Sequence, residues 1–70
     1  MKLSDAREGE YVVSKIDDDY RLMLYQLGIV EGSVIDVEIK TRSAIVLNLK
    51  PLGRIGIPRS LGEHIEVEPV

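Results

Sequence analysis

The segment 19–32 constrains the fold of this chain most, because a short helix must end at a glycine and a strand must begin only a few residues later. Gly28 stands where the helix is expected to stop, since glycine readily adopts the left-handed conformation that follows a last helical turn. Gly32 provides a second bend directly before the alternating segment 33–40. Few small folds place so short a helix immediately before a strand.

Both ends of this helix carry residues that suit a helix terminus. Asp18 or Asp19 is expected to cap the N-terminus by accepting backbone N–H bonds, and its charge favours the positive end of the helix dipole. At the C-terminus, Ile29 stands where a Schellman closure would fold it back onto Leu24. The sequence therefore predicts a short helix with a defined start and a sharp end.

Two further segments, 33–40 and 45–50, alternate apolar and polar side chains with the period of a half-buried strand. The apolar side chains expected to face the core are Ile35, Val37, Ile39, Ile45, Leu47 and Leu49. In the earlier β-prone segment 11–16, the apolar residues Val13 and Ile16 lie three residues apart. This spacing predicts a bulge or a strong bend in the first strand.

The remaining expected elements are a short strand at 54–57, a helical turn at 59–62 and a last strand at 64–68. Five short strands with one helix and one helical turn predict a mainly β fold. The simplest architecture that uses them all is a small SH3-like barrel of about five antiparallel strands, whose closure protects the strand edges. With no internal repeat or linker, the chain is expected to form one domain over residues 1–70.

Composition excludes several classes of function. The net charge of −3 and the absence of Trp and Phe argue against nucleic-acid binding, which needs a basic face and aromatic platforms. His64 is the only histidine, and neither a nucleophile elbow nor a glycine-rich phosphate loop is present, so no enzyme activity is expected. No apolar run approaches the roughly 20 residues of a bilayer span and no signal peptide opens the chain, so the protein is expected to be cytoplasmic, without direct membrane insertion.

The helix carries apolar residues on two sides. The stripe expected to face the core consists of Tyr20, Leu24 and Leu27. The residues beside or opposite this stripe are Leu22, Met23, Tyr25 and Gln26. Leu22 and Tyr25 either pack against an N-terminal arm that contains Leu3, or form an apolar docking patch for another protein. These two interpretations are about equally favoured.

Two groups of polar residues are candidates for metal binding. His64, Glu66 and Glu68 share one face of the expected last strand, and such ligands suit a transition metal. Because residues on one face of a strand lie roughly 7 Å apart, a solvated charged face is the favoured interpretation, with His64 and Glu66 as weak metal candidates. The acidic run 17–19 is interpreted as helix capping rather than as a cation site.

The helix and the strand after it share a pattern of leucine, glycine and valine. The pattern consists of Leu24, Leu27-Gly28-Ile29, Gly32, Val34 and Val37. It resembles the signature L..LG(I/L/M).pG..(V/I).V of FeoA proteins, small cytosolic partners of the bacterial and archaeal ferrous-iron transporter. The resemblance extends from Leu3-Ser4-Asp5 to Ile65-Glu66-Val67. Glu31 and Gly62 depart from the pattern, since the family often has proline and alanine there.

The resemblance implies an SH3-like barrel and a non-catalytic cytosolic accessory protein of ferrous iron transport. Its partner would be the membrane iron transporter (FeoB-like), contacted on the cytosolic side. The contact is expected to use Leu22, Met23, Tyr25 and Gln26. The resemblance implies no cofactor. Weak binding of Fe(II) or another divalent metal stays open, and so does assembly into a homo-oligomer.

Two other functions stay open. Similar domains are found at the C-termini of iron- and manganese-responsive repressors. The first alternative is therefore a transition-metal-binding or metal-sensing domain. A tight Fe(II) or Mn(II) titration that involves His64 would favour it. The second alternative is a peptide-binding SH3-like adaptor, although three tyrosines that are expected to be dispersed make a poor aromatic groove.

Overall fold

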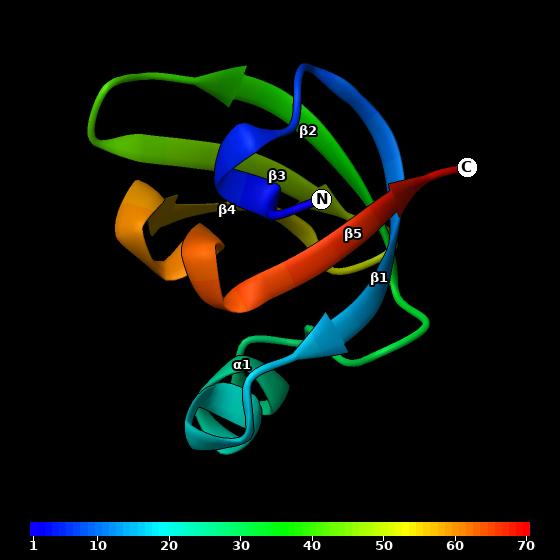
Figure 1. The fold of residues 1–70 in the computed structure, drawn as a ribbon. Coiled ribbons are helices and arrows are strands. Elements are labelled where there is room, and N and C mark those ends of the chain that lie inside the picture. The colour runs from blue at the N-terminus through cyan, green and yellow to red at the C-terminus, as the bar shows by residue number, and fades with distance from the viewer.

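The five strands form one antiparallel sheet in the order β4-β3-β2-β1-β5. The computed structural model describes residues 1–70 (Figure 1). Its strands are β1 (Gly9–Ile16), β2 (Val34–Lys40), β3 (Ala44–Leu49), β4 (Gly53–Pro58) and β5 (Ile65–Pro69). Its helical elements are the 3₁₀ turns η1 (Leu3–Asp5), η2 (Asp18–Tyr20) and η3 (Arg59–His64), and the helix α1 (Arg21–Gln26). The predicted SH3-like arrangement of five antiparallel strands, one helix and one helical turn before the last strand is confirmed.

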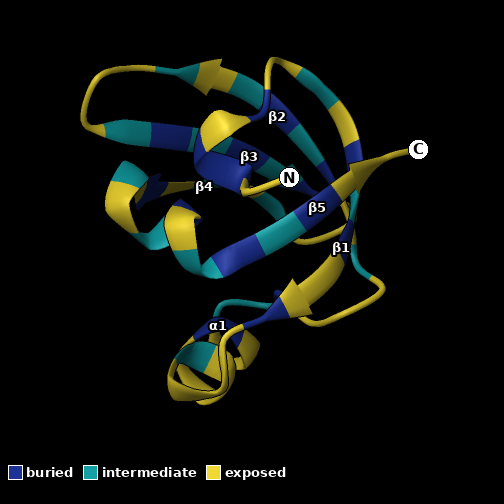
Figure 2. Cartoon of the chain, in the orientation of Figure 1, coloured by how far each residue is buried: buried dark blue, intermediate teal, exposed yellow.

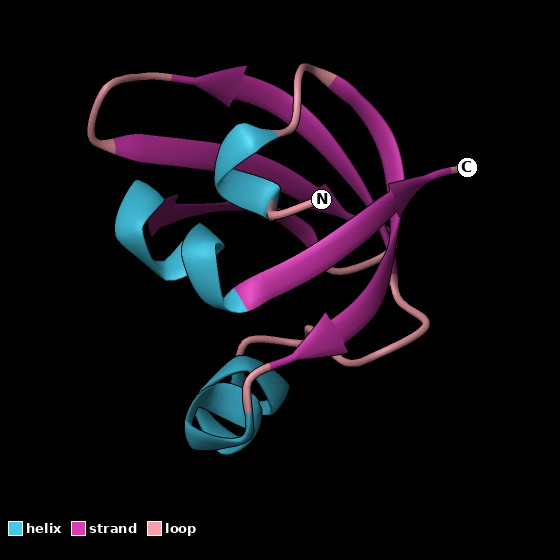
Figure 3. Cartoon of the chain, viewed as in Figure 1, coloured by secondary structure: helices cyan, strands magenta, loops and turns pink.

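The sheet curls around its core but does not close into a complete barrel. β4 and β5 lie at the two ends of the strand order, and η3 spans the gap between them (Figures 1 and 3). The outer edge of β5 is occupied by the first residues of the chain. Met1 and Val67 exchange two backbone hydrogen bonds of 2.8 and 3.0 Å, and Lys2 forms an isolated bridge with Glu66.

The core lies inside the curled sheet and beneath η1 and η3 (Figure 2). The buried apolar residues are Leu3, Ala6, Tyr11, Val13, Ile16, Leu24, Ile29, Ile35, Val37, Ile45, Leu47, Leu49, Ile57, Ile65 and Val67. Five of the six side chains expected to point inward from the alternating segments are among them. The alternation therefore predicted the core face of β3 completely and that of β2 in part.

Ile39 is the exception, because 52% of its surface is exposed. The pairing between β2 and β3 shifts register between Val37 and Ile39, and this irregularity turns Ile39 away from the core. The expectation that Ile39 faces inward was wrong. The bulge expected in β1 is confirmed, since the β1–β5 register shifts between Val13 and Lys15. That shift allows both Val13 and Ile16 to be buried.

The C-terminal end of α1 is closed as the sequence predicts. Gly28 has a φ of 91°, and its N–H donates to the Tyr25 carbonyl at 3.0 Å. The Ile29 N–H donates to the Leu24 carbonyl at 2.8 Å, which completes a Schellman motif. Gly32, with a φ of 92°, supplies the second bend before β2.

The N-terminal end differs from the expectation. No side chain caps η2 or α1, so the prediction that Asp18 or Asp19 accepts backbone N–H bonds was wrong. Instead, the Asp17 carbonyl accepts the Tyr20 N–H at 2.9 Å, and η2 leads directly into α1. The carboxylates of Asp17 and Asp18 are engaged elsewhere, because they contact His64 and Arg21.

Candidate functional site

The helix α1 lies at one end of the molecule, beside the end of β1 and apart from most of the sheet (Figure 1). Leu24 is its only buried residue. Tyr20 and Leu27, which flank the helix, are partly buried and pack against the core, as the predicted stripe requires. The other side of the helix is open to solvent.

We call the exposed side chains of Leu22, Met23, Tyr25 and Gln26 the helix face. Leu22 is 69% exposed, Tyr25 is 67% exposed and Met23 is 42% exposed. Leu3 is fully buried in the core, so it does not cover Leu22 or Tyr25. The interpretation in which an N-terminal arm packs on these two residues is therefore wrong, and the helix face has no cover within the chain.

A charged network holds the helix against the end of β1. Arg21 Nε donates to Asp18 Oδ1 at 2.8 Å, and Arg21 Nη2 lies 3.0 Å from Glu31 Oε2. The same Glu31 oxygen accepts the backbone N–H of Ile16 at 3.1 Å. Glu31 thus joins the loop after the helix to both the helix and β1.

This network shifts the pKa of each member. The hydrogen bond from Arg21, followed by its charge, lowers the pKa of Asp18 below its ordinary value of 3.8. The pKa of Glu31 is lowered first by the Arg21 hydrogen bond and then by the Ile16 N–H. The hydrogen bonds to both carboxylates raise the pKa of Arg21 in return. All three groups are therefore charged at neutral pH.

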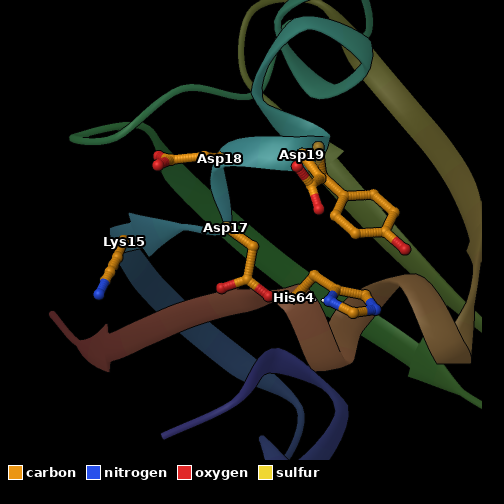
Figure 4. Close-up of a pocket in the computed structure, with 6 residues that line it drawn as sticks. Lys15, Asp17, Asp18, Asp19 and His64 are labelled. Atoms are coloured by element: carbon orange, nitrogen blue, oxygen red, sulfur yellow. Dashed lines mark hydrogen bonds and ion pairs between the residues drawn. The ribbon is translucent and has the colours of Figure 1, made fainter.

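A second contact holds η2 from the opposite side. His64 Nδ1 lies 2.8 Å from Asp17 Oδ2, and the Asp17 N–H donates to the His64 carbonyl at 3.0 Å. The His64 ring stacks on the Tyr20 ring with centroids 4.0 Å apart and an interplanar angle of 20°. Figure 4 shows Asp17 beside His64, while Asp18 points away from both. These residues, with Lys15 and Asp19, line a shallow depression of about 400 Å³.

The structure does not arrange the metal candidates as the sequence analysis expected. His64 ends η3 rather than beginning the last strand, so it does not share a strand face with Glu66 and Glu68. Its Nδ1 is engaged by Asp17, and Glu66 lies opposite Lys15 in the β1–β5 register. No group of three or more His, Cys, Asp or Glu side chains is placed so that it could hold a metal ion.

A small groove adjoins the C-terminal end of the helix. Gly28, Val34 and the turn after β3 line this groove, whose volume is about 320 Å³. Leu52, in that turn, is 68% exposed, and one of its methyl groups occupies the space where a Cβ on Gly28 would lie. The sequence analysis did not identify Leu52. The available signal was an apolar residue between Pro51 and Gly53, inside a turn that is otherwise expected to be polar.

The three tyrosines are dispersed, as expected for a poor aromatic groove. Tyr11 is buried, Tyr20 stacks on His64, and Tyr25 is exposed on the helix face.

No helix in the structure is long and apolar enough to cross a membrane.

Comparisons with known proteins give a consistent family. The family model described as "FeoA domain" matches residues 1–69. An NMR structure of a FeoA-like protein from Clostridium acetobutylicum aligns with a TM-score of 0.86 and 24% identity, over 100% of this chain and 86% of that one. A FeoA protein from Chlorobium tepidum aligns with a TM-score of 0.84 and 24% identity, over 100% and 70%. No curated protein matches the chain.

The same fold occurs inside a larger protein. The crystal structure of ScaR with bound Zn²⁺ aligns with a TM-score of 0.91 and 20% identity. The alignment covers 100% of this chain but only 37% of ScaR. At identities below a quarter, these structural similarities establish the fold, while the family model establishes the membership.

Proposed function

This chain belongs to the FeoA domain family, and from that premise we propose that it docks through its helix face on the cytosolic side of a membrane ferrous-iron transporter. The family supports an accessory, non-catalytic role in ferrous iron transport. The docking surface, the partner and the cytosolic location are the parts that we add.

The observation that carries the proposal is the exposure of Leu22 and Tyr25 on a helix of six residues. Single exposed apolar side chains are ordinary on protein surfaces, but here they adjoin a third, Met23, on one short element. Complete burial of a leucine or a similar side chain stabilises a complex by about 1.5–3 kcal/mol. Two or three such side chains supply a compact apolar centre for an interface.

The helix face is also held in place before any partner arrives. The Schellman motif fixes one end of α1, while the Arg21 network and the Asp17–His64 contact hold the other end. A fixed surface loses little conformational entropy on binding, which favours affinity. Gln26 and Arg21 lie beside the apolar residues and would form part of a polar rim.

Two charge substitutions test the docking surface. Leu22→Asp and Tyr25→Asp each place a carboxylate in the apolar centre, and both side chains are exposed, so the fold should be kept. Ile39→Asp is the matched control, because Ile39 is also an exposed apolar side chain but lies on β2. The four immobilised proteins are incubated with detergent-solubilised membranes of the source organism, and captured proteins are identified by mass spectrometry.

We expect the original chain and Ile39→Asp to capture an iron transporter, and the two helix variants to lose it. Equal capture by all four proteins would place the interface away from the helix face. Absence of the transporter from every sample, including a chemically cross-linked one, would contradict docking itself.

A further inference from the structure

Positive charge is concentrated in one part of the sheet. Residues 39–62 contain five basic residues and no Asp or Glu. The basic residues are Lys40, Arg42, Lys50, Arg54 and Arg59. All twelve acidic residues and only four basic ones lie in the rest of the chain. Because residues 39–62 form the end of β2, β3, β4 and most of η3, the β4 side of the molecule is basic while the β1 and β5 side is acidic.

The basic side also contains the unpaired edge of the sheet. β4 pairs only with β3, whereas the outer edge of β5 is occupied by Met1 and Lys2. An unpaired edge presents backbone N–H and C=O groups that can pair with another extended chain. η3 lies across the gap beyond β4, so the part of this edge that can accept a further strand is the exposed stretch around Arg54 and Gly56.

The register identifies the backbone groups at this edge. The Arg59 N–H donates to the Ser43 carbonyl at 2.9 Å, and this pair continues the register of the β3–β4 ladder. Hydrogen-bonded pairs alternate along an antiparallel ladder, so Ile57 and Ile55 bond to β3 while Arg54 and Gly56 direct their backbone groups outward. No backbone hydrogen bond outside the strand ladders reaches Arg54 or Gly56.

The edge is accessible at its centre. Gly56 is exposed, and a Cβ built on it would meet no atom within 4 Å. Arg54 and Pro58 on either side are exposed as well. Pro58 has no N–H, so the pairing edge ends there.

We propose that the outer edge of β4 binds an extended acidic segment of a partner protein, which adds to the sheet as a sixth strand. The main chain of that segment would pair with Arg54 and Gly56, and its carboxylates would meet Lys50, Arg54 and Arg59. Lys50 forms no ion pair within the chain, whereas Arg54 pairs with Glu38 on β2 and Arg59 donates to the Thr41 carbonyl at 3.2 Å. Lys50 is therefore the unengaged cation, and a carboxylate of the segment would compete with Glu38 and Thr41 for the two arginines. This surface is separate from the helix face and does not depend on it.

Other occupants fit the edge less well. Two copies of β4 placed side by side would bring two basic regions together, which opposes self-association through this edge. Nucleic acid would use the positive charge but not the outward backbone pairs, and the chain as a whole is negative. An acidic polypeptide uses both features.

The binding test uses short peptides of alternating valine and glutamate, with matched peptides in which lysine or threonine replaces glutamate. Each is titrated into the ¹⁵N-labelled chain, and amide shifts and exchange rates are recorded. We expect the glutamate peptide to shift and protect the Arg54 and Gly56 N–H groups, and the lysine peptide to have no effect. Shifts restricted to the helix face, or equal effects of the lysine peptide or a uridine oligonucleotide, would overturn the proposal. If the Arg54 and Gly56 amide resonances shift when the free chain alone is concentrated, the edge binds a second copy of the chain instead.

Gly56→Pro and Gly56→Ala form a matched pair. Proline removes the outward N–H and leaves the hydrogen bonds between β3 and β4 intact, whereas alanine keeps the outward N–H. We expect Gly56→Pro to weaken binding of the glutamate peptide by about tenfold and Gly56→Ala to leave it within about twofold. Unchanged affinity in a folded Gly56→Pro chain would overturn the proposal.

Lys50→Glu, at an exposed site away from the ladder, gives a second test. We expect this variant to bind the glutamate peptide more weakly than the original chain does, and to bind the lysine peptide. An unchanged preference for the glutamate peptide over the lysine peptide would count against binding at the β4 edge.

Discussion

Gly28 illustrates how much a single residue can decide in a chain of this size. Its φ of 91° belongs to the left-handed region, and its missing side chain leaves room for Leu52. The first property was predictable from the glycine that follows a helical pattern. The second was not, because the turn that carries Leu52 reaches the helix only in the folded chain.

The two contributions can be separated with a pair of alanine variants. Gly32 has nearly the same φ, but a Cβ there would meet no atom within 4 Å. Gly32→Ala should therefore cost about 1–2 kcal/mol of unfolding free energy from backbone strain alone. Gly28→Ala should cost more, since Leu52 must also move. Urea denaturation of both variants measures the difference, and equal losses would show that Leu52 yields freely.

The acidic run 17–19 shows where residue-level reasoning failed. Caps were expected because acidic residues commonly precede a helix. Asp17 instead contacts His64, a residue distant in sequence, and Asp18 contacts Arg21 within the helix. Charged partners compete with backbone N–H groups for a carboxylate, and the sequence order does not reveal which partner is near.

At the scale of elements, α1 depends on one buried side chain. Leu24 is fully buried, while Leu22 two residues earlier is mostly exposed. Leu24→Ala should lower the unfolding free energy by about 2–5 kcal/mol, because it leaves a cavity between helix and sheet. Leu22→Ala, the same chemical change, should alter it by less than about 0.5 kcal/mol. Chemical denaturation of the two variants tests this contrast, and similar losses would mean that the helix face is covered in solution.

The strands show which element properties a sequence contains. Alternation identified the inward residues of β3 because no irregularity interrupts that strand. In β2 the same alternation failed at Ile39, since the register shift depends on how the partner strand is placed. The spacing of Val13 and Ile16 did reveal the bulge in β1, because the break fell within the apolar pattern itself.

At the scale of the whole molecule, the Arg21 network connects the helix, the loop after it and β1. Both carboxylates have a lowered pKa in the folded state, so they stabilise the fold at a pH above their ordinary values of 3.8 and 4.5. Their contribution should disappear as the pH falls below those values and through the folded-state pKa of each. Thermal melts from pH 7 to pH 3 would measure this loss.

Glu31→Gln provides the control for that measurement. Glutamine keeps a hydrogen-bond acceptor for the Ile16 N–H but has no charge to titrate. The variant should melt at a lower temperature than the original chain at pH 7, and the two should converge at low pH. A constant difference across the range would show that the Glu31 charge does not contribute.

The fold was predictable at this scale, while its chemical contacts were not. Short alternating segments, turn glycines and one short helix with a sharp end are local features of the sequence. Together they predicted one simple architecture. The exposed helix face also followed from the helical period. The Asp17–His64 contact, the position of Leu52 and the free edge of β4 depend on which distant segments meet, and no local pattern records that.

The strand order has a further consequence for how the chain reaches its folded state. β2, β3 and β4 are joined consecutively, so their pairing requires only short loops to close. The pairing of β1 with β5 places Tyr11 opposite Pro69 and must close nearly the whole chain. Since closing a longer loop costs more entropy, we expect the three-strand meander to form first and the β1–β5 seam to form last. By the same argument, the Asp17–His64 contact, which joins residues 47 apart, should form late, whereas the Arg21 network closes only the segment 16–31.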